Sequence, residues 1–344
     1  MTTTDLRPVP YDPDLEPGLA AFLDLVEQIP LRADTILTNR EHFATIVPPI
    51  ESVLSGRPVQ HSEHQAPGPA GAPEVTVSVF RPAGARDDGA ARPALFGIHG
   101  GGMVLGNRFF GVEALLEYVE RHGAVAATVE YRLAPDHPAP AQAEDCYAAL
   151  CWFSEHAQEL GFDPERLVVT GDSAGGGLSA AVALMARDRG GPPIAGQLLG
   201  APMIDDRNDT VSSWQYDGIG AWDRNNNDTA WTAILGSRRF SAEVSPYEAP
   251  ARASELCGLP PAFIDVGAAE VFRDEAVRYA LDIWATGGQA ELHVWAGGYH
   301  GFSGFSPQTT VARAATAARG SWMRRILHLE DGEDGSLELD ARAQ

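Results

Sequence analysis

From residue 94 onward, short apolar runs alternate with longer stretches that have the spacing of an amphipathic helix. The apolar runs cover residues 94–98, 124–131, 167–170, 195–199, 261–266 and 290–295. The helical stretches cover residues 141–156, 178–187, 273–285 and 309–327. Short apolar runs bounded by turn signals are typical of buried strands. The alternation therefore predicts an α/β fold, with a mainly parallel central sheet and helices on both of its faces.

The rest of the chain departs from this alternation. Residues 15–56 carry apolar side chains at helical spacing, whereas residues 61–74 are rich in Pro, Gly and Ala and predict a linker. Residues 75–80 alternate between apolar and polar, which predicts a strand. Residues 203–258 are too long for a plain connection, so we expect an excursion over the carboxyl edge of the sheet. We expect the acidic residues after Leu329 to be disordered.

The charge balance argues against two classes of binding partner. The 344 residues include 25 basic and 47 acidic side chains, which gives a net charge of −22 at pH 7. Such a surface repels phosphate backbones and anionic lipid headgroups, so we expect neither nucleic acid nor a membrane as a partner. The sequence contains no lysine, which excludes Schiff-base chemistry on a lysine.

Cysteine usage and apolar run lengths set further limits. The three cysteines form no C-x-x-C pair, which argues against a disulfide framework and against a zinc site, so we expect no metal. No apolar run reaches the roughly 18 residues of a membrane span. The polar, acidic first residues do not resemble a signal peptide. We therefore expect a cytoplasmic protein.

Residues 171–175 read Gly-Asp-Ser-Ala-Gly and lie between a predicted strand and a predicted helix. This is the setting of a nucleophile elbow, in which a sharp strand-to-helix turn exposes a serine hydroxyl above the sheet. Glycines flank the turn because no Cβ fits beside it. The pattern makes Ser173 the candidate nucleophile. The alternative is a glycine-rich surface turn.

A second glycine-rich segment, His99-Gly100-Gly101-Gly102, directly follows a predicted strand. Three glycines allow backbone N–H groups to turn toward a ligand without obstruction by side chains. Acyl transfer builds negative charge on a carbonyl oxygen, which fixed N–H donors stabilise. We expect donors from the three glycines together with Ala174, the residue after the nucleophile. His99 would shape the loop rather than act as a base. The alternative is a simple flexible loop.

A serine nucleophile needs a base, and the base needs an acid that orients it. Among ten histidines, His300 stands out because it follows the last predicted strand on a Gly-flanked loop. The candidate acids near the preceding strand are Asp265, Glu270, Asp274 and Glu275. We prefer Glu270 because it lies on the connecting loop, and Asp265 is the second choice.

Five motifs occur in a characteristic order: His-Gly-Gly-Gly at 99–102, Tyr-Arg-Leu-Ala-Pro at 131–135, Gly-Asp-Ser-Ala-Gly at 171–175, Arg-Asp-Glu at 273–275 and His-Gly-Phe at 300–302. Over about residues 75–325 the chain thereby resembles the hormone-sensitive-lipase-like family of α/β-hydrolase esterases. The resemblance implies a serine carboxylesterase that needs no cofactor.

The chain departs from the family at two positions. The family usually has Asp where this chain has Glu270, and Glu where it has Asp136. Since Glu serves in other triads, we expect a triad of Ser173, His300 and Glu270.

The resemblance also implies a division into a catalytic domain and a helical cap. Residues 75–202 and 259–328 would form the α/β-hydrolase domain. The N-terminal part of the cap would be residues 1–60, and the inserted part would be residues 203–258. Residues 329–344 would be the acidic tail.

We expect the substrate to be a small ester with a short acyl chain, because a helical cap that closes over the elbow favours short chains in this family. The pocket would be lined by Met103, Phe109, Phe110 and Phe302, with tryptophans from residues 203–258. Aromatic side chains also form cores, so packing within the cap is an equal alternative.

Other activities stay open at this point. The same triad can serve an amidase, a lactonase or a deacetylase, and a hydrolase fold can bind a ligand without reaction. Family members often pair, so a homodimer is a further expectation.

Overall fold

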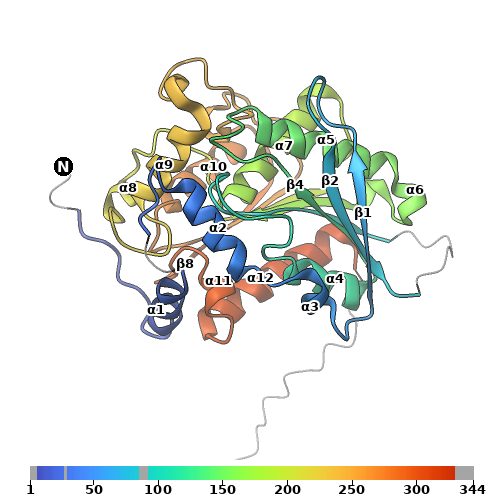
Figure 1. Cartoon of the computed structure of the whole chain (residues 1–344), viewed down its shortest axis with the longest axis horizontal. Coiled ribbons are helices and arrows are strands. Elements are labelled where there is room, and N and C mark those ends of the chain that lie inside the picture. Colours follow the sequence, from blue (N-terminus) through green and yellow to red (C-terminus); the bar gives the residue numbers. More distant parts are fainter. Residues whose placement is uncertain (1–5, 27–28, 85–91, 330–344) are drawn as a thin grey trace, which may run out of the picture.

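The computed structural model describes residues 6–26, 29–84 and 92–329. Its centre is one eight-stranded sheet with the order β1-β2-β4-β3-β5-β6-β7-β8 (Figure 1). The strands are β1 (Val59–Ala66), β2 (Val75–Pro82), β3 (Ala94–Ile98), β4 (Val125–Glu130), β5 (Leu167–Asp172), β6 (Gly196–Gly200), β7 (Ala262–Gly267) and β8 (Ala290–Trp295). Strands β3 to β8 are parallel, and β2 is antiparallel to both β1 and β4. The predicted α/β fold with a mainly parallel sheet is confirmed.

Helices cover both faces of this sheet. They are α1 (Glu16–Leu25), α2 (Ile36–Ile46), α3 (Ile50–Leu54), α4 (Glu113–His122), α5 (Ala141–Glu155), α6 (Ala157–Leu160), α7 (Ala174–Arg189), α8 (Val211–Gln215), α9 (Arg224–Leu235), α10 (Arg273–Ala285), α11 (Phe302–Phe305) and α12 (Thr310–Leu327). Figure 1 shows α4 and α12 below the sheet and α5 and α7 above it. None of the helices in the described ranges is long and apolar enough to cross a bilayer.

Two apolar clusters correspond to the two faces. Leu116 of α4 and Met323 of α12 share one cluster with Leu95 of β3. The other cluster contains buried side chains of α5, α7 and α10. Every residue of α7 from Ala174 to Ala186 is buried, and most are Ala or Gly. These small side chains let α7 lie close against the sheet, directly behind the turn that contains Ser173.

Helices α1 and α2 lie on the side of the molecule where α8 and α9 are found, whereas α3 lies beside α4 (Figure 1). The hydroxyl of Thr229 in α9 donates to the carbonyl of Leu31, 3.1 Å away. The hydroxyl of Tyr216 donates to the carbonyl of Val9 at 2.7 Å. The two segments assigned to a cap are therefore in direct contact. Their role as a cap stays a prediction.

One sequence-based expectation is wrong. Residues 61–74 are not a plain linker, because β1 occupies Val59–Ala66 and pairs with β2. The strand contains polar residues on both faces, which hides its periodicity. It lies at the edge of the sheet, where polar side chains are tolerated. Its buried contacts come from histidine rings, since His61 stacks on Phe80 and His64 packs against Trp152.

Three smaller differences concern helices. The helical stretch at 15–56 consists of three helices, α1 to α3. Helix α7 begins at Ala174 rather than Leu178, and α4 was not anticipated. The expected disorder of the tail concerns residues that, apart from Leu329, lie outside the described ranges.

Candidate active site

Ser173 forms the turn between β5 and α7. Its φ of 61° lies in the left-handed region, which is unfavourable for a residue with a Cβ and marks a strained turn. A Cβ on Gly171 would overlap the backbone of Gly175, and a Cβ on Gly175 would overlap the carbonyl of Ile98. The N–H of Ser173 donates to the carbonyl of Gly200 at 2.8 Å. The turn therefore has the strand–turn–helix geometry of a nucleophile elbow.

His300 and Glu270 are hydrogen-bonded to each other. Nδ1 of His300 lies 2.6 Å from Oε2 of Glu270. The other carboxylate oxygen, Oε1, accepts the N–H of Gly267 at 3.1 Å. The Glu270 side chain is only 2% exposed, and the rings of Phe272 and His300 pack in a T-shaped contact. A carboxylate can only accept, so Nδ1 carries the proton and Nε2 is the basic nitrogen.

Asp265, the second choice for the acid, has other partners. Both of its carboxylate oxygens accept from Nε of Arg319, at 3.1 and 3.0 Å. The indole N–H of Trp295 donates to Oδ2 at 3.1 Å. The structure thus gives His300 a single carboxylate partner among these two candidates, which is Glu270.

The sheet brings the three residues to one edge. Ser173 follows β5, Glu270 follows β7 and His300 follows β8, and these strands are parallel. Carboxyl ends of parallel strands are the usual place for a site in such sheets. Among the described residues, no hydrogen bond joins the Ser173 hydroxyl to His300. Such contacts in free enzymes often tighten only when substrate binds.

The glycine loop lies directly against the elbow. A Cβ on Gly100 would be 3.0 Å from the carbonyl oxygen of Asp172 and 3.5 Å from Cβ of Ser173. Gly101 and Gly102 have φ of 107° and 61°, which only glycine adopts easily. Within the described part of the chain, no hydrogen bond has the N–H of Gly100, Gly101, Gly102 or Ala174 as its donor. These donors are free for a ligand.

His99 stabilises the glycine loop, and among the described residues no hydrogen bond joins it to Ser173. Its Nδ1 donates to the carbonyl of Gly100 at 2.8 Å, and its ring stacks on Tyr131. The Tyr131 hydroxyl donates to the carbonyl of His99 at 2.9 Å. Burial lowers the pKa of His99 to about 4, so the ring is neutral near pH 7. This matches the expected role of His99 in shaping the loop.

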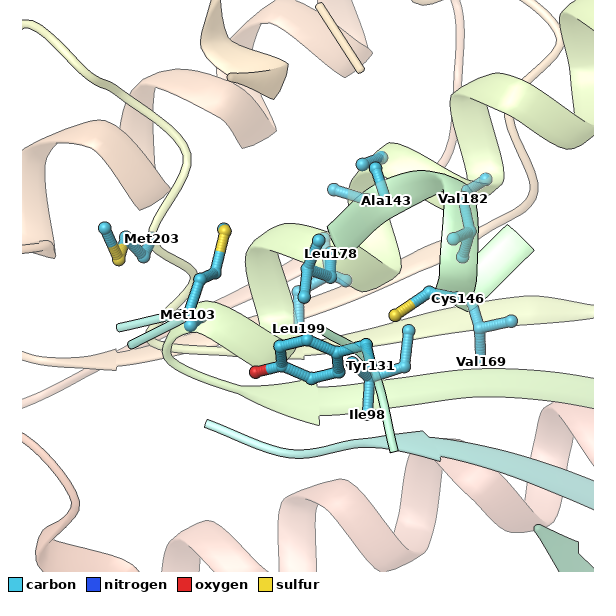
Figure 2. Packing of buried hydrophobic residues seen from close by; sticks show 14 of the residues in the cluster. Ile98, Met103, Tyr131, Ala143, Cys146, Val169, Leu178, Val182, Leu199 and Met203 are labelled. Atoms are coloured by element: carbon cyan, nitrogen blue, oxygen red, sulfur yellow. The ribbon is translucent and has the colours of Figure 1, made fainter. Parts of the chain in front are cut away.

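Trp222, which belongs to the segment 203–258, covers the glycine loop. A Cβ on Gly102 would lie 2.5 Å from Cη2 of Trp222. The next residue, Met103, is buried in the main cluster. Figure 2 shows Met103 and Met203 at the same end of that cluster, away from Val169. Met203 in turn donates its N–H to the carbonyl of Ser173 at 3.0 Å. Met203 therefore contacts the elbow directly, and Trp222 contacts the glycine loop that lies against the elbow.

The other three predicted pocket residues have different packing neighbours from one another in the structure. Phe110 packs edge-on against Phe43 of α2, with ring centroids 4.9 Å apart. Phe109 lies under Arg108, in contact with the cluster of α4 and α12. Phe302 is buried in a third cluster beside α1. The presence of these aromatic residues in the sequence does not indicate which neighbours each ring packs against. The predicted pocket stays a prediction, and Trp222 is the tryptophan of residues 203–258 that lies against the glycine loop.

The fold and the elbow define a class of protein. A sequence model of the α/β-hydrolase fold family matches residues 95–304, so the chain belongs to this family. The matched range includes the glycine loop, the elbow, Glu270 and His300. The resemblance to hormone-sensitive-lipase-like esterases is confirmed by the relatives that follow.

Several individual proteins are similar over nearly the whole chain. Carboxylesterase NlhH of Mycobacterium tuberculosis is 33% identical over 328 residues, which cover 94% of this chain and 99% of that protein. The structure of a bacterial heroin esterase superposes with a TM-score of 0.83 at 35% identity, covering 92% of this chain and 98% of the other. Esterase LipW from Mycobacterium marinum gives a TM-score of 0.79 at 30% identity, covering 93% and 99%.

Proposed function

We propose that this chain is a serine carboxylesterase that hydrolyses short-chain acyl esters through an acyl-enzyme. The observation that carries the proposal is the 2.6 Å hydrogen bond between His300 and Glu270, at the sheet edge where the elbow presents Ser173. The family and the esterases among its similar proteins support the reaction class. Each of the three side chains has one role in this proposal.

In the first step, the Ser173 hydroxyl attacks the acyl carbon while Nε2 of His300 accepts its proton. Glu270 stabilises the imidazolium that forms and fixes the ring through Nδ1. The protonated His300 then gives its proton to the departing alcohol. The acyl group stays on Ser173.

In the second step, His300 removes a proton from a water molecule, and the resulting hydroxide attacks the acyl carbon. The acid leaves, and the proton returns from His300 to the oxygen of Ser173. No cofactor is needed in either step, because no oxidation state changes and the chain itself supplies the nucleophile, the base and the oxyanion donors.

The oxyanion of each step would be held by backbone N–H groups. The free donors of Gly100, Gly101, Gly102 and Ala174 lie around the elbow, and α7 begins at Ala174. The N-terminus of a helix carries a partial positive charge, which adds to the stabilisation of an anion. Loss of one such donor costs about 10²–10³ in turnover in other enzymes.

The size of the acyl group follows from the residues around the elbow. Trp222 lies against Gly102, the adjacent Met103 is buried, and the buried Met203 donates its N–H to the carbonyl of Ser173. The contact between Trp222 and Gly102 supports a small acyl group, so we propose short-chain acyl esters as substrates. Residues 203–258 and the N-terminal helices would form the cap over this space.

Covalent labelling tests the nucleophile. A fluorophosphonate probe should add its mass once to the wild type, on the peptide that contains residues 171–175. The Ser173→Ala variant should gain no mass, while Ser179→Ala, which removes a buried serine of the same helix, should label as the wild type does. Labelling at another residue would contradict the proposal.

A further inference from the structure

A charged cluster lies next to the elbow and has no part in the mechanism described so far. Arg319 of α12 reaches two carboxylates with one guanidinium group. Its Nη2 lies 2.8 Å from Oδ1 of Asp172 and 2.8 Å from Oδ1 of Asp265. Its Nε donates to the carboxylate of Asp265 as well. Asp265 and Arg319 are largely buried, with side chains 2% and 20% exposed.

These two carboxylates belong to strands that are not neighbours. Asp172 ends β5 and Asp265 lies in β7, and β6 runs between them. Gly200 of β6 makes the connection possible, because a Cβ at this position would overlap both Asp172 Oδ1 and Arg319 Nη2. The guanidinium therefore bridges the ends of β5 and β7 across the last residue of β6.

The same cluster extends to β8 and to the backbone of the elbow. Trp295 at the end of β8 donates its indole N–H to Asp265 at 3.1 Å. The carbonyl of Gly200 accepts the N–H of Ser173, and the carbonyl of Asp265 accepts the N–H of Ala201 at 2.6 Å. Arg319 is thus connected, directly or through one residue, to the ends of β5, β6, β7 and β8.

Three of these four strands, β5, β7 and β8, each lead into one member of the proposed triad. Asp172 directly precedes Ser173, Asp265 precedes the loop of Glu270, and Trp295 precedes the loop of His300. We infer that Arg319 is a positioning residue, which fixes the spacing between the nucleophile and its acid–base pair by bridging Asp172 and Asp265. This inference rests on the proposed serine esterase mechanism.

The chemistry of arginine suits this role. A guanidinium presents several N–H donors in a rigid plane, so one group can hold two carboxylates in a fixed relative geometry. A lysine ammonium is a point charge on a flexible chain and holds the same two carboxylates less rigidly. Because a displacement of about 1 Å can cost on the order of 10²-fold in rate, a loosened bridge should lower turnover.

The test compares Arg319→Met, Arg319→Lys and the matched control Arg325→Gln. Arg325 lies on the same helix and pairs with Glu291 of β8, away from the elbow. Steady-state hydrolysis of nitrophenyl butyrate gives kcat and KM per active site, counted by fluorophosphonate titration. We expect Arg319→Met to lower kcat about tenfold to a hundredfold with little change in KM. Arg319→Lys should recover part of the loss, and Arg325→Gln should match the wild type.

A purely structural role predicts something different. In that case Arg319→Met would lower the melting temperature and leave kcat per titrated site at the wild-type value, which would overturn the inference. If Arg319→Met does not fold, Asp172→Asn replaces it, because Asp172 is exposed and its loss removes one side of the bridge. A wild-type kcat in that variant would equally overturn the inference.

Hydrogen exchange separates this inference from the proposed function. If the wild type hydrolyses no ester, the proposed function fails, and the bridge is then judged from exchange alone. Loosening of the bridge between Asp172 and Asp265 should accelerate hydrogen exchange at the backbone N–H of Ser173, which donates to the carbonyl of Gly200. Faster exchange of the elbow peptide in Arg319→Met, but not in Arg325→Gln, supports the bridge. Equal exchange in all variants overturns it.

Discussion

Nδ1 of His300 lies 2.6 Å from Oε2 of Glu270, and this carboxylate is held from its other side by the N–H of Gly267. The pair is formed by the loops after β7 and β8, so two adjacent parallel strands place it. With both carboxylate oxygens bonded, the ring can keep one orientation. The proposed mechanism depends on this orientation, because it directs Nε2 away from Glu270.

Replacement of Glu270 by Gln should lower kcat by about 10⁴-fold, because an amide can hold the ring in the wrong tautomer. Glu270→Asp keeps the charge on a shorter side chain and should retain much more activity than the amide. Glu291→Gln, which changes a partly exposed carboxylate of β8, is the control and should match the wild type. Steady-state kinetics and a thermal melt of each variant check this. Wild-type turnover in Glu270→Gln would remove this residue from the triad.

The buried His99 should make the protein less stable in acid. Its pKa is lowered by burial from 6.5 to about 4, so the folded state keeps it neutral while the unfolded chain binds a proton. The free energy of unfolding therefore begins to fall below about pH 6.5, where the unfolded chain binds the proton. The total loss reaches about 3 kcal/mol as the pH falls to about 4. Urea unfolding at about pH 7.5 and 4.5 should show a smaller difference for His99→Gln than for the wild type. An equal difference in both proteins would contradict the assignment.

Trp222 should limit the length of the acyl chain. Trp222→Ala opens space beside Gly102, so the ratio of octanoyl to butyryl kcat/KM should rise roughly tenfold or more. Trp214→Ala is the control, because Trp214 stacks with Arg224 and its indole donates to Asp209. Hydrolysis of an acyl-length series measures the ratio. An unchanged profile in Trp222→Ala would show that another residue closes the pocket.

Arg40 should connect the N-terminal helices to the active-site loops. Its guanidinium donates to the carbonyls of Val104 and Ala134, at 2.9 and 2.7 Å. Arg40→Met would leave both carbonyls without this donor, at a cost of about 1–3 kcal/mol for a buried group. Arg57→Met removes a partly exposed pair with Glu120 and should cost less than about 1 kcal/mol. Denaturant unfolding compares the two, and equal losses would contradict this role of Arg40.

Much of the central sheet could be predicted from the sequence, because its parallel strands are buried on both faces. β3 and β6, for example, are buried throughout, and their apolar runs were found within a residue of their true bounds. β1 was missed because its side chains are polar at the edge of the sheet. The signal for α4 was present in Leu115, Leu116 and Val119, which share one buried face.

The parts of the site that consist of consecutive residues could be predicted from the sequence. The parts that depend on contacts between residues far apart in the chain could not. Ser173 and the glycine loop carry motifs that their own backbone geometry requires. The choice between Glu270 and Asp265 needed the structure, because only the fold shows that Asp265 bonds to Arg319. The contact between Gly102 and Trp222 likewise joins parts of the chain that no local pattern relates.

The most direct test of the account is the hydrolysis of nitrophenyl esters, from acetyl to dodecanoyl, by the wild type and by Ser173→Ala. We predict strong activity on the short esters, a steep fall with chain length, and loss of activity in a folded Ser173→Ala variant. Persistent activity in Ser173→Ala, or no hydrolysis of any ester by the folded wild type, would contradict the assignment of a serine esterase.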